Sequence, residues 1–424
     1  MARIEIGSAT DDPRDLGRPL MSDHNLSARL WATAAVAAVP IASALRIGWW
    51  LPVHLAMLGA ASQAIVGGQL MFSTTLGLSR GPARSRSLTQ LGLLNLGAAL
   101  VVGSRIWSWP GVLAAGASIF IATICWVTWQ VHLLWRRSIN RRFSITGTFY
   151  RLAGLSLIVG ASIGGALGIG AFDDASPYLA HRGVHMTLNV LGWAGLTIVG
   201  TAVTLLPTIL HVRAPKLHTI RGAPWLMFGG LALLSAGATL GQELLAGAGM
   251  VCYVVGLIAF GIYVRRILVV SRRRKIPTAA LHLIAAFVWS AVTSVGLIVS
   301  FTLADPSLTR DVLVVGGASG FVFQALIGAW SFLLPSTRPP VAERRRRELI
   351  AMELGGRPQV LAYNAGLVAV LIGLQTNIDS SLAGIVLTWS AAAWAIGKSW
   401  SFRLLATFPS VRAYSERWWA PPEG

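Results

Sequence analysis

Charged residues are scarce in this chain of 424 residues: 12% of it is Asp, Glu, Lys or Arg, whereas 54% is hydrophobic. A soluble domain of this length needs a far more charged surface, so this composition and a mean hydropathy of +0.64 exclude that class. Acidic residues number only 16, and none lies near the centre of an apolar run. A proton pump or cation-coupled transporter built on intramembrane carboxylates therefore lacks its usual residues.

Cysteine is almost absent, which argues against a thiolate metal site. Cys125 and Cys252 each lie inside an apolar stretch, without a CxxC motif or a paired partner. We therefore expect both to be small core residues.

A cleavable signal sequence is missing as well. The first 25 residues mix acidic and basic side chains without an apolar core, so we expect membrane insertion to start from the first apolar run. Translation can start at Met1 or at Met21, and we assign no function to residues 1–20.

The chain does contain a series of apolar runs of about 20 residues, the length that crosses about 30 Å of hydrocarbon. These runs predict an all-α polytopic membrane protein with twelve transmembrane helices. The membrane domain is expected at 28–400, between cytoplasmic tails at 1–27 and 401–424. The expected spans are 30–48, 52–77, 88–106, 109–134, 149–171, 183–210, 224–242, 244–269, 279–303, 312–334, 359–376 and 381–397.

The distribution of basic residues orients these spans. When alternate loops are assigned to one side of the bilayer, all but four of the 35 Lys and Arg fall on that side. The positive-inside bias then places both termini in the cytoplasm and the protein in the cell membrane. The net charge of +19 is therefore an orientation signal, and we expect no nucleic-acid partner.

One sequence pattern occurs three times, in apolar segments about 130 residues apart. Its form is Gly-x-x-x-(Gln/Leu)-(Ala/Thr)-(Ile/Leu)-(Val/Ile)-Gly-small, at 59–68, 192–201 and 320–329. The copies fall in the second, sixth and tenth predicted spans, so the twelve helices divide into three sets of four. We predict three pseudo-symmetric four-helix arcs. The small residues either let helices approach closely or leave room for a flat ligand.

Histidines near the outer helix ends are the candidate metal ligands. His54 precedes its repeat glycine by five residues, His185 precedes its own by seven, and His181 lies one turn before His185. Met57 and Met186 stand close to them in sequence and add the thioether sulfur that copper(I) accepts. The alternative is that these histidines are interfacial residues bonded to backbone or water. His24 is assigned to the tail, and His282 is either a second ligand, a proton relay or a structural residue.

Four arginines lie beside the outer helix ends. A pair of haem propionates there would need cationic partners, although arginines at this depth also extend to lipid headgroups without any further role. The four are Arg46, Arg105, Arg182 and Arg310.

These features resemble a known family. Twelve spans in three arcs, with histidine in the second and sixth, are similar to subunit I of the haem-copper oxidases and to NnrS-like membrane proteins. The stretch His185-Met-Thr-Leu-Asn-Val-Leu-Gly-Trp-Ala-Gly-Leu-Thr-Ile-Val-Gly200 resembles a His-x-His-Leu-Asn-Leu-Leu-Gly segment of NnrS-like proteins and of the membrane part of some actinobacterial copper oxidases. The resemblance implies haem and copper as cofactors, bound near the outer leaflet.

The chain also departs from this pattern. Thr187 stands where the resemblance implies a second histidine, and Asn189 stands where an oxidase carries tyrosine. The seventh predicted span and the stretch 312–321 contain no histidine. A full oxygen-reducing centre needs more imidazoles than remain, so a terminal oxidase is not expected.

The sequence therefore predicts a membrane protein that binds haem, copper or both through a reduced ligand set and handles metal, nitric oxide or electrons, with a redox or copper-handling protein as partner. If it is an enzyme, it is an oxidoreductase. One alternative is a cofactor-free transporter or assembly factor with a polar route through the helices, and another is a scaffold whose basic inner loop at 344–347 recruits a partner. The polar route would be lined by Gln63, Gln69, Asn95, Asn189 and Gln324.

Overall fold

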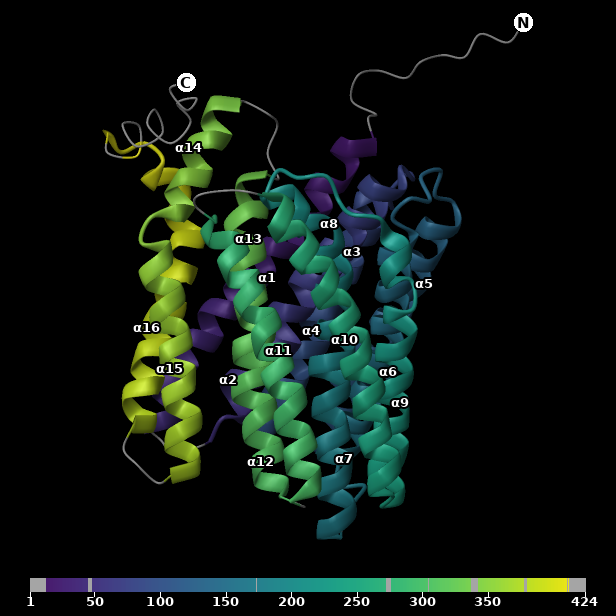
Figure 1. Ribbon diagram of the computed structural model, residues 1–424. Helices are drawn as coiled ribbons and strands as arrows, with labels where there is room; N and C mark the ends of the chain where they lie inside the picture. Colours follow the sequence, from purple (N-terminus) through teal and green to yellow (C-terminus); the bar gives the residue numbers. More distant parts are fainter. Residues whose placement is uncertain are drawn as a thin grey trace, which may run out of the picture.

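The computed structural model describes residues 13–44, 48–172, 174–271, 276–303, 305–336, 342–376, 380–409 and 411, and all regular structure in these ranges is helical. The helices run roughly parallel to one another as a bundle (Figure 1). The α-helices are α1 (Pro13–Ala44), α2 (Trp50–His54), α3 (Ser62–Gly77), α4 (Arg84–Trp107), α5 (Pro110–Arg136), α6 (Ser144–Gly168), α7 (Ala175–Thr187), α8 (Leu196–Ile209), α9 (Ala223–Leu240), α10 (Glu243–Ser271), α11 (Thr278–Thr302), α12 (Pro306–Asp311), α13 (Gln324–Ser336), α14 (Ala342–Glu353), α15 (Gly356–Thr376) and α16 (Ser380–Leu405). Three π-helices, η1 (Leu55–Ala61), η2 (Leu188–Gly195) and η4 (Val312–Phe323), and a 3-10 helix, η3 (Leu217–Ile220), complete the set.

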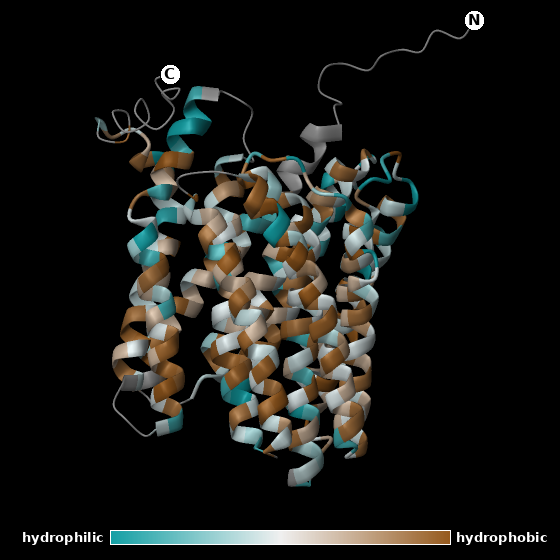
Figure 2. Ribbon diagram, in the orientation of Figure 1, coloured by the Kyte–Doolittle hydropathy of each residue, from teal (hydrophilic) through white to brown (hydrophobic). Residues whose placement is uncertain are grey.

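Ten helical stretches in the described part of the chain are long and apolar enough to cross a membrane. Hydrophobic residues dominate the middle of the bundle and hydrophilic residues gather at its two ends (Figure 2). The predicted all-α class is therefore confirmed, and the architecture is compatible with a multi-pass membrane protein.

The sequence predicted twelve spans, two more than these ten. The two remaining ones correspond to α1 and α16, which have 32 and 26 residues but carry Arg29 and Lys398. Both polar side chains are held inside the protein: Arg29 donates to the Ser399 carbonyl at 2.8 Å, and the Lys398 ammonium donates to the Met352 carbonyl at 3.0 Å. A charged residue that is hydrogen-bonded to a neighbouring helix lowers the mean hydropathy of its own helix. The helix keeps the length that a membrane span requires.

The three copies of the repeat lie in the most buried helices. We call these three the inner helices, and each one is a continuous run of three helical elements. They are α2–η1–α3, α7–η2–α8 and α12–η4–α13. Between 67% and 89% of the residues in their apolar windows are buried, against 33% to 44% in the other seven stretches. The repeat therefore marks the centre of the bundle.

Each inner helix changes from α to π geometry at its repeat. The first glycine of each copy, Gly59, Gly192 or Gly320, lies inside η1, η2 or η4 respectively. Serine hydroxyls add bonds to carbonyls five residues earlier: Ser62 donates to the Met57 carbonyl at 3.0 Å, and Ser319 donates to the Val314 carbonyl at 3.1 Å. π-helical turns occur frequently at functional sites.

The repeat glycines are close-packing points against the helix that precedes each inner helix. A Cβ built on any repeat glycine would lie 2.5 to 3.0 Å from a side chain of the preceding helix. In each copy, the residue that meets the first glycine and the residue that meets the second are seven positions apart on that preceding helix. The first-glycine pairs are Gly59–Trp31, Gly192–Ser156 and Gly320–Trp289; the second-glycine pairs are Gly67–His24, Gly200–Phe149 and Gly328–His282.

In two of the copies, the tryptophan that meets the first glycine also makes an equivalent hydrogen bond to a further helix. The Trp31 indole donates to Asn95 Oδ1 at 2.7 Å, and the Trp289 indole donates to Asn364 Oδ1 at 2.7 Å. Asn95 is on α4 and Asn364 is on α15, each beyond the inner helix in chain order. Corresponding residues of two copies therefore make the same contacts.

The inner helices meet around a small apolar cavity of about 80 Å³. The Gln69 amide also joins two of them by donating to the Thr197 hydroxyl at 3.0 Å. Each copy contributes small side chains to the cavity wall: Ala64 and Gly68, Thr201 and Ala202, and Ala325 and Ala329.

The N-terminal boundary differs from the prediction. Helix α1 begins at Pro13, and His24, expected in the tail, is fully buried with its Nδ1 2.9 Å from Gln63 Oε1. Asn25 is also buried and accepts a hydrogen bond from the Trp330 indole at 3.1 Å. A hydropathy average assigns these polar residues to an exterior tail, because it contains no information on the hydrogen-bond partners that they have inside the protein.

The basic stretch 344–347 was expected to be an inner loop, but it lies within α14. Its Ala, Glu, Arg, Leu and Met residues are strong helix formers. Glu348, Ile350 and Met352 are buried. Helix α14 therefore packs onto the bundle (Figure 1).

We expect Gly59→Ala and Gly320→Ala to destabilise the protein, because the added methyl group collides with a tryptophan ring. Overpacking of this kind costs about 1–3 kcal/mol. Gly68→Ala is the matched control, since nothing lies within 4 Å of its Cβ position. Thermal unfolding in detergent should show a lower Tm for the two repeat variants only. Equal Tm values for all three variants would contradict the close-packing role.

Candidate metal centre

Two predicted ligands from different inner helices meet at one end of the bundle. His54 ends α2 and His185 lies in α7, yet their imidazole centroids are 6.4 Å apart and their ring planes differ by 12°. Both segments lie in the lower half of the bundle, away from α14 (Figure 1). The structure therefore brings together the two histidines at the centre of the sequence prediction.

Trp50 orients the His54 ring. The Nδ1 atom of His54 lies 2.8 Å from the Trp50 carbonyl, one turn earlier in the same helix. The indole of Trp50 stacks on the imidazole, with ring centroids 4.0 Å apart. These two contacts fix both the tilt and the rotation of the ring.

Helix α6 orients the His185 ring. Its Nδ1 atom lies 2.8 Å from the Gly160 carbonyl, and the Asn189 amide donates to the backbone carbonyl of His185 at 2.8 Å. A Cβ on Gly164 would collide with the imidazole itself. The absence of a side chain at Gly164 therefore creates the space that the ring occupies.

The hydrogen bonds set the tautomer of both histidines. A carbonyl oxygen can only accept, so the bond to Trp50 places the proton of His54 on Nδ1. At His185 the Asn189 amide nitrogen also lies 3.1 Å from Nδ1, but the Gly160 carbonyl is closer, at 2.8 Å, and this bond requires a proton on Nδ1. In the neutral imidazole the proton-free nitrogen is then Nε2, whose lone pair is available. Metal-binding histidines almost always donate their second ring nitrogen to a carbonyl, a carboxylate or water in this way.

The two imidazoles are the donor groups of the candidate centre. Their ring centroids lie 6.4 Å apart in a stacked arrangement. Within the described ranges, no group of three or more His, Cys, Asp and Glu could hold an ion, so the site is a pair of imidazoles.

The other predicted ligands have different surroundings. His181 Nδ1 lies 2.7 Å from the Pro177 carbonyl, and its ring stacks on Phe172 with centroids 3.9 Å apart. Met57 and Met186 are partly buried and pack against the main apolar core. The structure thus accounts for His181 by contacts of its own and for the two methionines by packing.

The outer arginines, predicted as propionate anchors, separate into distinct roles. Arg105 lies on α4, and its charge acts on the His54 imidazole. Arg182 lies over the Tyr178 ring at 5.9 Å. Arg310 is paired with Asp311, to which its Nε and Nη2 both bind at 2.8 Å. Arg46 lies outside the described residues.

The sequence prediction missed the residues that orient the pair. Gly160 and Gly164 are two of several glycines in an apolar helix, and Trp50 looks like an ordinary interfacial aromatic residue. Gly160 and Gly164 are four residues apart and so lie on one face of a helix, which was the sequence signal that could have pointed to them. Only the structure shows that this face of α6 meets His185.

Comparison with known proteins does not assign a family to the chain. No protein-family model matches it, and a search of curated proteins finds no similar sequence.

We expect the histidine side chains of purified, ¹⁵N-labelled protein to show the Nδ1–H tautomer at both His54 and His185. Gly164→Ala should displace the signals of His185, because its methyl group would occupy the space of the ring. Gly183→Ala is the control, since its nearest neighbour lies 3.8 Å away. An Nε2–H tautomer at either histidine would contradict the proposed availability of the lone pair.

Proposed function

We propose that this protein is an integral membrane metal-binding protein with twelve spans in three pseudo-symmetric four-helix arcs. Three copies of one repeat in the three most buried helices support this arrangement. The charge bias of the sequence supports a cell-membrane location with both termini in the cytoplasm. On that orientation, the end of the bundle that carries His54 and His185 lies toward the outer leaflet.

His54 and His185 would hold the iron of a haem, or a copper ion, as its imidazole ligands. The observation that carries this proposal is the pair of nearly parallel imidazoles 6.4 Å apart, each with Nδ1 bound to a carbonyl. The donor set fits either group, since imidazole nitrogen suits both iron and copper. Arg105, whose charge acts on the His54 imidazole, would be a cationic partner for an anionic haem edge.

Each residue of the site has a defined part in this function. His54 and His185 bind, Trp50 and Gly160 hold the protons on Nδ1, and Gly164 leaves space for one ring. When bound, the metal supplies one-electron transfer or a position for a diatomic gas such as nitric oxide. A redox or copper-handling protein is the expected partner. Two imidazoles are too few for a full oxygen-reducing centre.

A cofactor-free transporter or assembly factor is the second candidate. Buried polar atoms without hydrogen-bond partners favour it, namely both ring nitrogens of His282 and both amide atoms of Gln324. However, Gln63 and Gln69, two other residues of the predicted polar route, are bonded within the bundle. Substrate flux in proteoliposomes that survives loss of His54 and His185 would favour this candidate.

Purified protein should carry haem or copper, measured by its optical spectrum and by metal analysis. His54→Ala and His185→Ala should each lower the metal-to-protein ratio at least about tenfold, because one ligand is lost. His181→Ala is the matched control and should keep the metal, since its ring is engaged elsewhere. Unchanged metal content in both pair variants, or no metal in the wild type, would contradict the proposal.

A further inference from the structure

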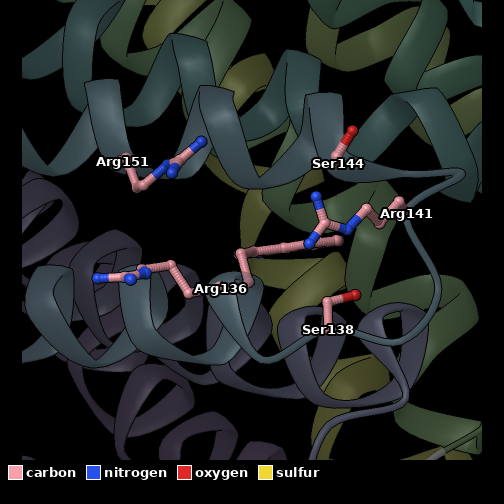
Figure 3. Close-up of a pocket in the computed structure, with 6 residues that line it drawn as sticks. Arg136, Ser138, Arg141, Ser144 and Arg151 are labelled. Atoms are coloured by element: carbon pink, nitrogen blue, oxygen red, sulfur yellow. The ribbon is translucent and has the colours of Figure 1, made fainter.

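A basic pocket lies at the opposite end of the bundle from His54 and His185. Its volume is about 420 Å³, and it is formed by the end of α5, the start of α6 and the turn that joins them. Figure 3 shows arginine and serine side chains from both helices around this space, with Arg141 reaching into it from the turn. The lining residues are Trp135, Arg136, Ser138, Arg141, Ser144 and Arg151.

The pocket gathers three positive charges without an acidic residue in its lining. Arg151 is half-buried and held in place, because its Nε donates to the Gly147 carbonyl at 3.1 Å and its Nη2 donates to the Thr148 hydroxyl at 3.2 Å. These bonds leave its Nη1 for a ligand. Arg136 and Arg151 line the pocket from α5 and α6 respectively.

The turn that carries Arg141 is fixed to the bundle. The Ser138 hydroxyl lies 2.9 Å from the Gly77 carbonyl at the end of α3 and 2.8 Å from the Asn140 carbonyl. The two helices beneath the pocket approach closely, since a Cβ on Gly147 would lie 2.5 Å from the Trp135 ring. The pocket is therefore a preformed feature of the fold.

The chemistry of the lining selects a phosphate group. Guanidinium groups bind phosphate oxygens with two parallel hydrogen bonds. The Ser144 hydroxyl stands exposed at the start of α6, a helix of 25 residues whose N-terminal dipole adds to the attraction for an anion.

The surroundings of the pocket favour a phosphate that carries acyl chains. On α5, Trp129 lies two turns before Arg136 and is 58% exposed; on α6, Leu155 follows Arg151 by one turn and is 46% exposed. Ile139, in the turn itself, is 82% exposed. An apolar surface thus runs from the pocket toward the middle of the bundle on both helices. Basic pockets between membrane helices bind anionic headgroups in this setting.

We propose that the pocket between α5 and α6 binds the phosphate of an anionic phospholipid headgroup, with Arg136, Arg141 and Arg151 as its cationic partners. The acyl chains lie along the exposed face that includes Trp129 and Leu155. This site is independent of the metal centre.

The test is titration of the detergent-purified full chain with phosphatidylglycerol, followed by native mass spectrometry. We expect one tight site in the wild type that prefers phosphatidylglycerol over phosphatidylcholine. The triple variant R136Q/R141Q/R151Q should bind at least about tenfold more weakly, as removal of three nearby charges predicts. The control R213Q/K216Q/R221Q removes equal charge from the α8–α9 connection and should bind as the wild type does.

The outcomes separate the pocket from its alternatives. If both triple variants bind phosphatidylglycerol equally weakly, the proposal is overturned, because the lipid is then attracted by the overall positive charge and not by this pocket. Displacement of phosphatidylglycerol by an equal concentration of inorganic phosphate would overturn the lipid as the source of the phosphate. If the triple variant fails to fold, R141Q alone, in the exposed turn, should weaken binding about fivefold, and unchanged binding would reject the site.

Discussion

The close approach of each inner helix to the helix before it is the contact on which the rest of the structure depends. In a bilayer the apolar driving force between helices is weak, so association relies on tight packing at small residues. The repeat supplies two glycines per inner helix, and a side chain of the preceding helix fills the space above each one. This contact is made three times, and the three inner helices meet around a cavity of about 80 Å³.

The pair of His54 and His185 belongs to this arrangement, although it does not repeat with it. His54 stands five residues before its glycine and His185 stands seven before its own, so they are not equivalent positions. Thr187, which is equivalent to His54, is buried instead. His54 and His185 thus come from two copies, at different distances from the repeat glycine, and meet where the two inner helices approach each other. The third copy contributes no histidine. An architecture built from equal units can thus hold one asymmetric site.

The π-helical turns connect the packing to the site. His54 immediately precedes η1, and His185 lies three residues before η2. A π turn widens the helix, and at the end of η1 the Ser62 hydroxyl adds a bond to the Met57 carbonyl. The segments that carry the first repeat glycines therefore adjoin both histidines in sequence.

Much of the fold was predictable, because apolar runs, basic loops and repeat glycines each reflect a local physical requirement. The histidines 54 and 185 were also recognisable, as ionisable residues near helix ends in two copies of one repeat. Other features depend on partners that no local pattern encodes. The burial of His24 requires Gln63, the pairing of Arg310 requires the folded turn around Asp311, and the space for the His185 ring requires Gly164 of another helix. The π-helical turns have no sequence signature beyond the glycines themselves.

The central claim is that His54 and His185 are ligands of one metal. X-ray absorption at the edge of the bound metal reports directly on the number of imidazoles in its coordination shell. The account predicts two imidazoles in the wild type and one in either single variant, His54→Ala or His185→Ala, under conditions of excess metal. An imidazole count that stays the same when both histidines are replaced would contradict it.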